Sequence, residues 1–232
     1  MININQIKGM KKLFILLLSL TFAINSNAQR TLFGNKNTKY TTENPKYQKG
    51  TVPELRGRIV FKEEIQTNNK DNNQVYQKLI SWANLRYMPN TSRGAWPSSL
   101  FFKNYEDAAV ISVNQQNHSI QCTGNEELVF HSSALSSDFA TINYFLDLEI
   151  SEDKISFKMS NISYIYNFSD TPEKLNAEDW ISDKKAFNKK GKPIKKCAKF
   201  RNETIDLKDR LINEIKSCLD IKETNKTKTP VL

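Results

Sequence analysis

The chain has 232 residues, and 34 Lys and Arg against 25 Asp and Glu give a formal net charge of +9. That length allows one domain with a sizeable core. Three cysteines, an odd number, exclude a disulfide framework. With two histidines and no Cys-x-x-Cys spacing, we expect no structural zinc and no cofactor.

The N-terminus carries the pattern of a secretory signal peptide. Met10–Lys12 is basic, Leu13–Ile24 is apolar, and a short polar stretch ends at Ala28 before Gln29. This pattern predicts a signal peptide over residues 1–28. The apolar run is too short to span a bilayer, so we expect no membrane span after cleavage. Since no cysteine follows the cut, we expect a periplasmic or secreted protein that is not a lipoprotein.

Three further regions follow from composition. Residues 29–54 are polar with little periodicity and are interpreted as a linker or extended arm. Residues 222–232 are rich in Lys and Thr and are expected to form a flexible tail. The segment between them, residues 55–221, is predicted to fold as a single domain.

The folded region is predicted to begin with a strand and a helix. The strand covers Arg58–Ile65, where apolar residues alternate with charged ones. The helix covers Gln74–Tyr87, because apolar residues recur at helical spacing and Pro89 follows. The stretch from 91 to 104 is expected to be a loop.

Four strands are predicted next, each with apolar residues at alternate positions: Ala108–Val113, His118–Ser132, Thr141–Ile150 and Lys154–Phe168. Gly124-Asn125 interrupts the second of these strands and is expected to bulge or bend it. In the fourth strand the apolar residues change from odd to even positions, which predicts a β-bulge near Ser160-Asn161.

The C-terminal third is predicted to be helical. Thr171 is placed as an N-cap with Pro172 at the first position, and a helical segment is expected over 177–190, ending at Gly191. The last helix is predicted over Ile205–Leu219 with Thr204 as its N-cap. Four consecutive strands with one apolar face, covered by helices, indicate an α+β domain: an antiparallel sheet of four to five strands with helices packed on one face.

Several segments then suggest a family: Gly57–Phe61, Trp82-Ala83, Arg86-Tyr87, Ala177–Ala186, Asn188–Gly191, Lys199–Arg201 and Thr204–Asp206. Together they resemble domain-of-unknown-function family 4468 (DUF4468), described as having a fold like that of the TATA-binding protein (TBP-like) and common in exported bacterial proteins. The resemblance covers about Leu55 to Leu219 and implies the order β-α-β-β-β-β-α. It implies no reaction, cofactor or ligand, and fold alone does not fix function.

Catalytic motifs are not recognisable in the sequence. His131-Ser132-Ser133 and Asp138 are residue types found in catalytic triads, but no nucleophile elbow accompanies them. Phosphate-binding glycine patterns are absent. An enzyme therefore ranks last among the functions considered.

The sharpest basic cluster lies late in the chain and consists of Lys184, Lys185, Lys189, Lys190, Lys192, Lys195, Lys196 and Lys199. One interpretation is an ordinary solvated face of a helix and turn. The other is contact with an anionic surface, for which Lys184, Lys185, Lys189 and Lys190 are the candidate residues. Few aromatic residues lie among these lysines, and with the export signal this argues against nucleic acid.

Aromatic residues suggest a second candidate site. Trp82, Tyr87, Tyr164 and Tyr166 are placed where the first helix meets the fourth strand, and could line a pocket for an apolar ligand. The alternative is ordinary core packing.

Three functions follow from these patterns. The first is an exported, non-enzymatic envelope module that binds an envelope protein or an anionic surface. The second is a carrier of an apolar small ligand held between sheet and helix. The third is an enzyme of unknown class. The sequence does not determine the oligomeric state.

Overall fold

The structure, a computed structural model, describes residues 44–87, 108–132, 137–167 and 171–221. The predicted signal peptide with its cleavage site at Ala28 and Gln29 lies outside the described residues. So do residues 29–43 of the predicted arm, the predicted loop at 91–104 and the predicted tail at 222–232.

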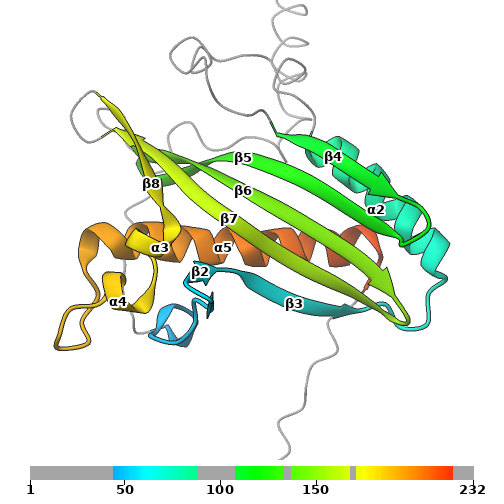
Figure 1. Cartoon of the computed structure of the whole chain (residues 1–232), viewed down its shortest axis with the longest axis horizontal. Coiled ribbons are helices and arrows are strands. Elements are labelled where there is room, and N and C mark those ends of the chain that lie inside the picture. Colours follow the sequence, from blue (N-terminus) through cyan, green and yellow to red (C-terminus); the bar gives the residue numbers. More distant parts are fainter. Residues whose placement is uncertain (1–43, 88–107, 133–136, 168–170, 222–232) are drawn as a thin grey trace, which may run out of the picture.

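A six-stranded antiparallel sheet forms the centre of the fold (Figure 1). Its strands are β3 (Phe61–Gln66), β4 (Ala109–Asn114), β5 (Ser119–Ser132), β6 (Ser137–Ser151), β7 (Lys154–Asn167) and β8 (Pro172–Asn176). They lie in the order β3-β7-β6-β5-β4, and β8 also pairs with β7. A separate pair joins β1 (Glu54–Leu55) to β2 (Arg58–Ile59). The predicted α+β class is confirmed, with more strands than the four to five expected.

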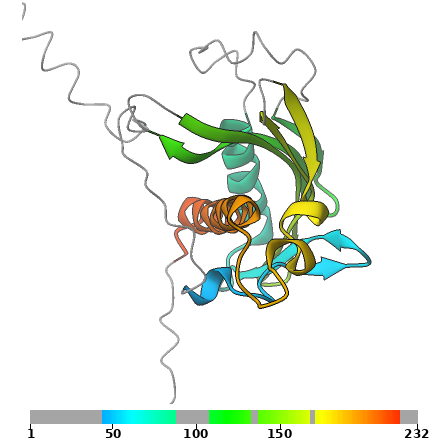
Figure 2. The same ribbon diagram turned by 90° about the vertical axis from the view of Figure 1, so that its left-hand side faces the viewer.

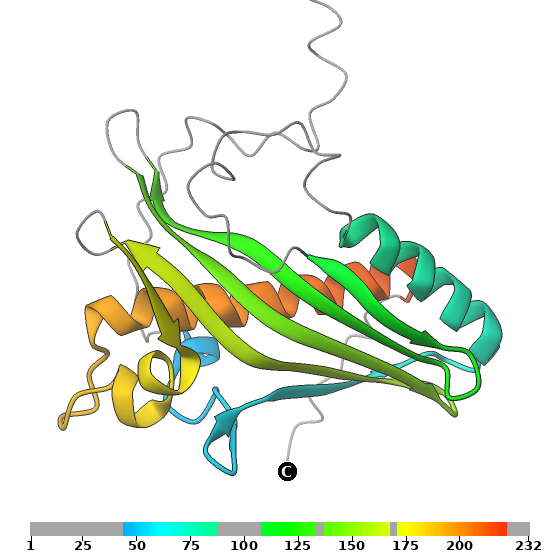
Figure 3. The same ribbon diagram turned by 45° about the horizontal axis from the view of Figure 1, so that its top comes forward.

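Two long helices, α2 (Asn72–Arg86) and α5 (Lys195–Cys218), cover one face of this sheet. The sheet curves around α5 (Figure 2), which runs along most of the length of the strands, while α2 lies beside β4 (Figure 3). The described residues also include three short helical elements: η1 (Pro45–Tyr47), α3 (Ala177–Trp180) and α4 (Asp183–Ala186).

The core lies between the concave face and the helices. Along β6, every second side chain from Ala140 to Ile150 is at most 4% exposed. Leu207, Leu211 and Ile215 of α5 are fully buried opposite them. Burying one such Leu or Ile side chain stabilises the fold by about 1.5–3 kcal/mol, so the apolar alternation fixes which face receives the helices.

The predicted β-bulge in β7 is confirmed. Asn143 pairs with Ser163 while Phe145 pairs with Ser160, so β7 holds one extra residue at this point. Asn161 takes up the distortion with a φ of 52°. The extra residue changes the parity of β7 and keeps Ile162 on the buried side.

The helix expected to start at Thr171 and Pro172 is instead strand β8. β3 pairs with β7 only as far as Met159, and β8 pairs with residues 163–167 of β7. The edge of the long strand β7 therefore needs a second partner, and this requirement overrides the local helix signal. The expected helical segment over 177–190 is reduced to the two short helices α3 and α4.

The last helix begins at Lys195, ten residues before the predicted start at Ile205. Thr204 is therefore not an N-cap but lies buried inside α5. Its hydroxyl donates to the carbonyl of Phe200 at 2.7 Å and is 2.8 Å from the Tyr164 hydroxyl. The buried residues Cys197, Ala198 and Phe200 extend the apolar face of the helix toward its N-terminus.

The bulge expected at Gly124-Asn125 is also wrong, because Gly124 pairs directly with Tyr144 and the irregularity in β5 lies between Val129 and His131. The Tyr144 ring lies against Gly124, so that a Cβ at this position would overlap the ring. Gly124 therefore serves close packing rather than a bend.

We expect Gly124→Ala to lower the free energy of unfolding by about 1–3 kcal/mol, because the added methyl group overpacks a buried ring. Urea denaturation measures this change. In a Tyr144→Leu background, which lacks the ring, Gly124→Ala should lower the free energy of unfolding by less than about half as much. An equal cost in both backgrounds would contradict the assignment.

Candidate functional site

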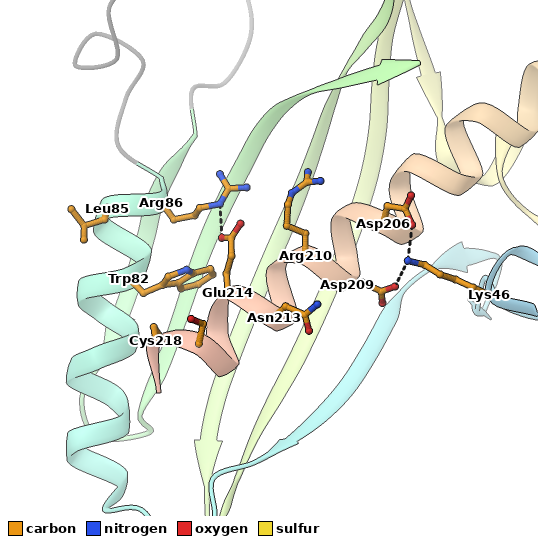
Figure 4. Close-up of a pocket in the computed structure, with 11 residues that line it drawn as sticks. Lys46, Trp82, Leu85, Arg86, Asp206, Asp209, Arg210, Asn213, Glu214 and Cys218 are labelled. Atoms are coloured by element: carbon orange, nitrogen blue, oxygen red, sulfur yellow. Dashed lines mark hydrogen bonds and ion pairs between the residues drawn. The ribbon is translucent and has the colours of Figure 1, made fainter. Parts of the chain in front are cut away.

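A groove between α2 and α5 is the first candidate site (Figure 4). It is open to solvent and has a volume of about 920 Å³. We call it the interhelix groove, and its lining residues are Lys46, Trp82, Leu85, Arg86, Asp206, Asp209, Arg210, Asn213, Glu214, Ser217 and Cys218.

The α2 wall of the interhelix groove consists of two apolar side chains and one arginine. Trp82, Leu85 and Arg86 share one face of α2 because they are three and four residues apart. Leu85 is 69% exposed. Trp82 is partly buried, and its ring meets that of Tyr87 edge-on with the centroids 5.9 Å apart.

One end of the groove is closed by ion pairs that join η1 to α5. Lys46 lies 2.6 Å from the carboxylates of both Asp206 and Asp209, and the Tyr47 hydroxyl donates to Asp206 at 2.7 Å. Burial acts to lower the pKa of Lys46, but the two carboxylates outweigh it and raise the pKa. The pKa of Asp209 is lowered because hydrogen bonds from Lys208 and Lys46 outweigh the effect of burial. Lys46 and Lys208 together therefore offset the charges of the two carboxylates at this end.

Glu126 of β5, whose side chain is 10% exposed, pairs with an arginine that lines the groove. The Arg86 guanidinium is 2.6 Å from it, and the Tyr144 hydroxyl donates to it at 2.5 Å. Arg86 also reaches Glu214 of α5 at 2.9 Å. Burial acts to lower the pKa of Arg86, but the charge of Glu126, with that of Glu214, raises it. Arg210 lies farther from Glu126, at 3.6 Å, and its side chain is 47% exposed.

The thiol in the groove is unsuited to nucleophilic chemistry at neutral pH. Burial raises the pKa of Cys218 to about 11, and the thiol donates to the Ile215 carbonyl at 3.2 Å. Only the thiolate is an effective nucleophile. Within the described part of the chain, no group of three or more His, Cys, Asp or Glu side chains is arranged to hold a metal ion.

The four aromatic residues predicted to line one pocket lie in two separate groups. Trp82 and Tyr87 belong to the groove side, where the Tyr87 hydroxyl is 3.3 Å from that of Tyr144. Tyr164 and Tyr166 surround Phe200, with ring centroids 5.0 and 5.3 Å from it. Tyr87 is 2% exposed and Tyr164 is 0% exposed, so both rings are packed in the core.

One residue of the predicted basic cluster turns inward. Lys199 donates to Asp138 at 2.8 Å and to the Tyr166 hydroxyl at 2.7 Å, and its ammonium lies 4.5 Å from the centroid of Phe130. Asp138, considered above as part of a catalytic triad, is thus engaged by Lys199 and also accepts from Tyr166.

The other lysines of the cluster lie within or next to residues 187–193, a segment that we call the lysine turn. Asn188 organises it: its side chain accepts from the backbone N–H of Lys190 and Lys192 at 2.9 and 3.0 Å. Gly191 has a φ of 74°, and Phe187 pairs with Pro193 across the base of the turn. Ala186, Phe187 and Cys197 pack together beneath it.

Lysines of this turn point to solvent. Lys184 and Lys185 lie on α4, Lys189 and Lys190 on the turn, and all four are exposed. Among the ion pairs of the described residues, Lys184 reaches Glu54 at 3.7 Å, and none involves Lys189 or Lys190.

Sequence patterns assigned no functional role to Arg86, Glu126 or Arg210. The spacing of Asp206, Arg210 and Glu214 at intervals of four residues places them on one face of α5 and was the one available signal. Their meeting with Arg86 and Glu126 depends on tertiary packing. Over the described residues, the helices are too short or too polar to cross a membrane.

Comparisons with known proteins confirm the family resemblance. Residues 61–165 match the family model described as a domain of unknown function (DUF4468) with TBP-like fold. A crystal structure of a DUF4468 family protein from Bacteroides ovatus is similar, with 28% identity and a TM-score of 0.64 over 78% of this chain and 97% of that one.

A TBP-like protein from Parabacteroides distasonis is 18% identical with a TM-score of 0.56, over 74% of this chain and 99% of that one, and shares the fold. No curated protein matches the chain.

We expect Arg86→Met to lower the free energy of unfolding by about 3 kcal/mol, because it removes the closest charge partner of buried Glu126. Lys78→Met on the same helix is the matched control. Its ion pair with Asp220 is solvent-exposed, and its loss should cost no more than about 0.5 kcal/mol. Urea denaturation of the two variants checks the difference, and equal losses would contradict a structural role for the Arg86 pair.

The reactivity of Cys218 gives a pH-dependent test. With a pKa of about 11, its rate of alkylation in the folded protein should rise about tenfold per pH unit between pH 8 and 10. Buried Cys122, whose pKa burial raises to about 12, should remain unlabelled. Mass spectrometry after timed N-ethylmaleimide treatment measures both thiols, with Cys218→Ser as control. A rate that levels off near pH 8.5 would contradict the prediction.

Proposed function

We propose that this chain, whose residues 61–165 match the DUF4468 family, is an exported, non-enzymatic binding module that attaches to an anionic lipid surface of the cell envelope. The signal-peptide pattern of residues 1–28 supports export. The exposed lysines around the lysine turn support the choice of surface, and they are the observation that carries the proposal.

The local geometry favours a functional role for these lysines. Each Lys near an anionic membrane surface contributes about 1 kcal/mol to binding. The lysine turn is already ordered by the Asn188 hydrogen bonds and the Phe187–Pro193 pairing, so little conformational entropy is lost when it binds. Lys189 and Lys190 have no acidic partner among the described residues that would compete with a lipid phosphate.

Vesicle flotation tests the proposal. The chain from Gln29 onward should bind vesicles of phosphatidylglycerol and phosphatidylcholine, and should not bind phosphatidylcholine alone. Raising the salt concentration should release it. Lys189→Gln combined with Lys190→Gln should weaken binding about 30-fold, the loss of about 2 kcal/mol.

The matched control is Lys62→Gln combined with Lys70→Gln, on β3 and in the loop before α2. It removes the same net charge and should weaken binding by less than about threefold. Equal losses in the two double variants would show that only overall charge acts. Failure of the unaltered chain to bind the anionic vesicles would reject the lipid surface.

A further inference from the structure

We propose that the interhelix groove is a second binding site, for a small amphiphile that carries one carboxylate. The apolar part of the ligand would lie on Trp82 and Leu85, and its carboxylate would pair with Arg210. This site involves none of the lysines on which the proposed function rests.

The size of the groove fits a small molecule. Its volume of about 920 Å³ falls within the range of roughly 300–1,000 Å³ that is usual for small-ligand sites.

The apolar part of the site comes from both helices. Trp82 extends from α2 toward α5, and Cys218 of α5 lies close to it (Figure 4). Leu85 adds an aliphatic side chain that is 69% exposed. An indole ring offers a large contact area with little loss of conformational entropy, so it suits an acyl chain or a ring.

Arg210 is the group of the groove that an anionic head group would contact. Lys46 and Lys208 together offset the charges of Asp206 and Asp209, and Arg86 pairs with Glu214. Arg210 is left with Glu126 at 3.6 Å, a carboxylate that Arg86 and Tyr144 already hold at shorter distance. Among the described cations that line the groove, Arg210 is therefore the one held least closely by a carboxylate, and a guanidinium matches a carboxylate through two parallel hydrogen bonds.

The surrounding carboxylates limit the charge of the ligand. Asp206, Asp209 and Glu214 line the same groove as Arg210 (Figure 4). A dianionic phosphate would keep one charge that Arg210 does not offset, beside carboxylates that are already paired, and a cationic head group would be repelled by Arg210. A single carboxylate on an apolar body satisfies both constraints.

Dodecanoate, below its critical micelle concentration, is the probe, and dodecanol is the uncharged control with the same chain. Isothermal titration calorimetry should show dodecanoate binding at least tenfold more tightly than dodecanol. Arg210→Gln should remove this preference, while Arg58→Gln, an exposed arginine on β2, should retain it. Leu85→Gln should weaken both ligands by a similar factor.

A second measurement locates the ligand. Saturating dodecanoate should slow the alkylation of Cys218 at pH 9 at least fivefold, because the thiol lines the groove. The Lys189→Gln and Lys190→Gln double variant should bind dodecanoate as the unaltered chain does, which separates this site from the lysine turn. Any one of three results would overturn the proposal. Dodecanoate and dodecanol could bind with equal affinity, or Arg210→Gln could reduce the preference for dodecanoate no more than Arg58→Gln does. The third such result is that dodecanoate leaves the alkylation rate of Cys218 unchanged.

Discussion

One carboxylate, Glu126 of β5, connects the sheet to both long helices. Glu126 lies on the inner face of β5, and its side chain is only 10% exposed. Removing such a charge from water costs several kcal/mol unless partners compensate. Arg86 of α2, Tyr144 of β6 and, at longer range, Arg210 of α5 supply that compensation. These pairs connect both helices to β5, in addition to the apolar contacts that α5 makes with the sheet.

A buried cation plays the corresponding role at the other end of α5. Arg201 is 1% exposed and donates to the carbonyls of Ile181 and Gln48 at 2.6 and 2.8 Å. It also pairs with Asp183 at 2.9 Å. Burial lowers the pKa of Arg201, against the opposing effect of Asp183. These contacts join the segment before β1 to α4 and α5. The Arg201 guanidinium also lies over the ring of Phe187, at the base of the lysine turn.

The sequence could predict features that depend on residues close together in the chain, and could not predict features that depend on tertiary contacts. The alternation of β6 and the bulge at Ser160-Asn161 depend on neighbours along one strand, and both were predictable. Strand β8 could not be predicted in this way, because it pairs with a part of the β7 edge that β3 leaves unpaired, and this edge exists only in the assembled sheet. Gly124 was misinterpreted as a bend, since its role depends on the ring of Tyr144.

The same rule applies to the candidate sites. The lysines of the turn are close in sequence, so their cluster was visible, except that Lys199 turns inward to Asp138. Trp82 was identified, but its partners in the groove come from α5 more than a hundred residues later. Arg86, Glu126 and Arg210 each look like ordinary surface residues until tertiary packing brings them together.

The lysine turn lies just before the start of α5, and its charges affect the stability of this helix. The N-terminus of a helix holds a partial positive charge, and cations there cost about 0.3–1 kcal/mol each. The first turn of α5 contains no acidic residue and begins with Lys195 and Lys196. These lysines therefore work against helix stability, and their charge adds to that of the helix end and of the neighbouring turn. Positive potential is thus concentrated at one end of a 24-residue helix, where it attracts anions. Lysines that served only solubility would be equally effective elsewhere on the surface.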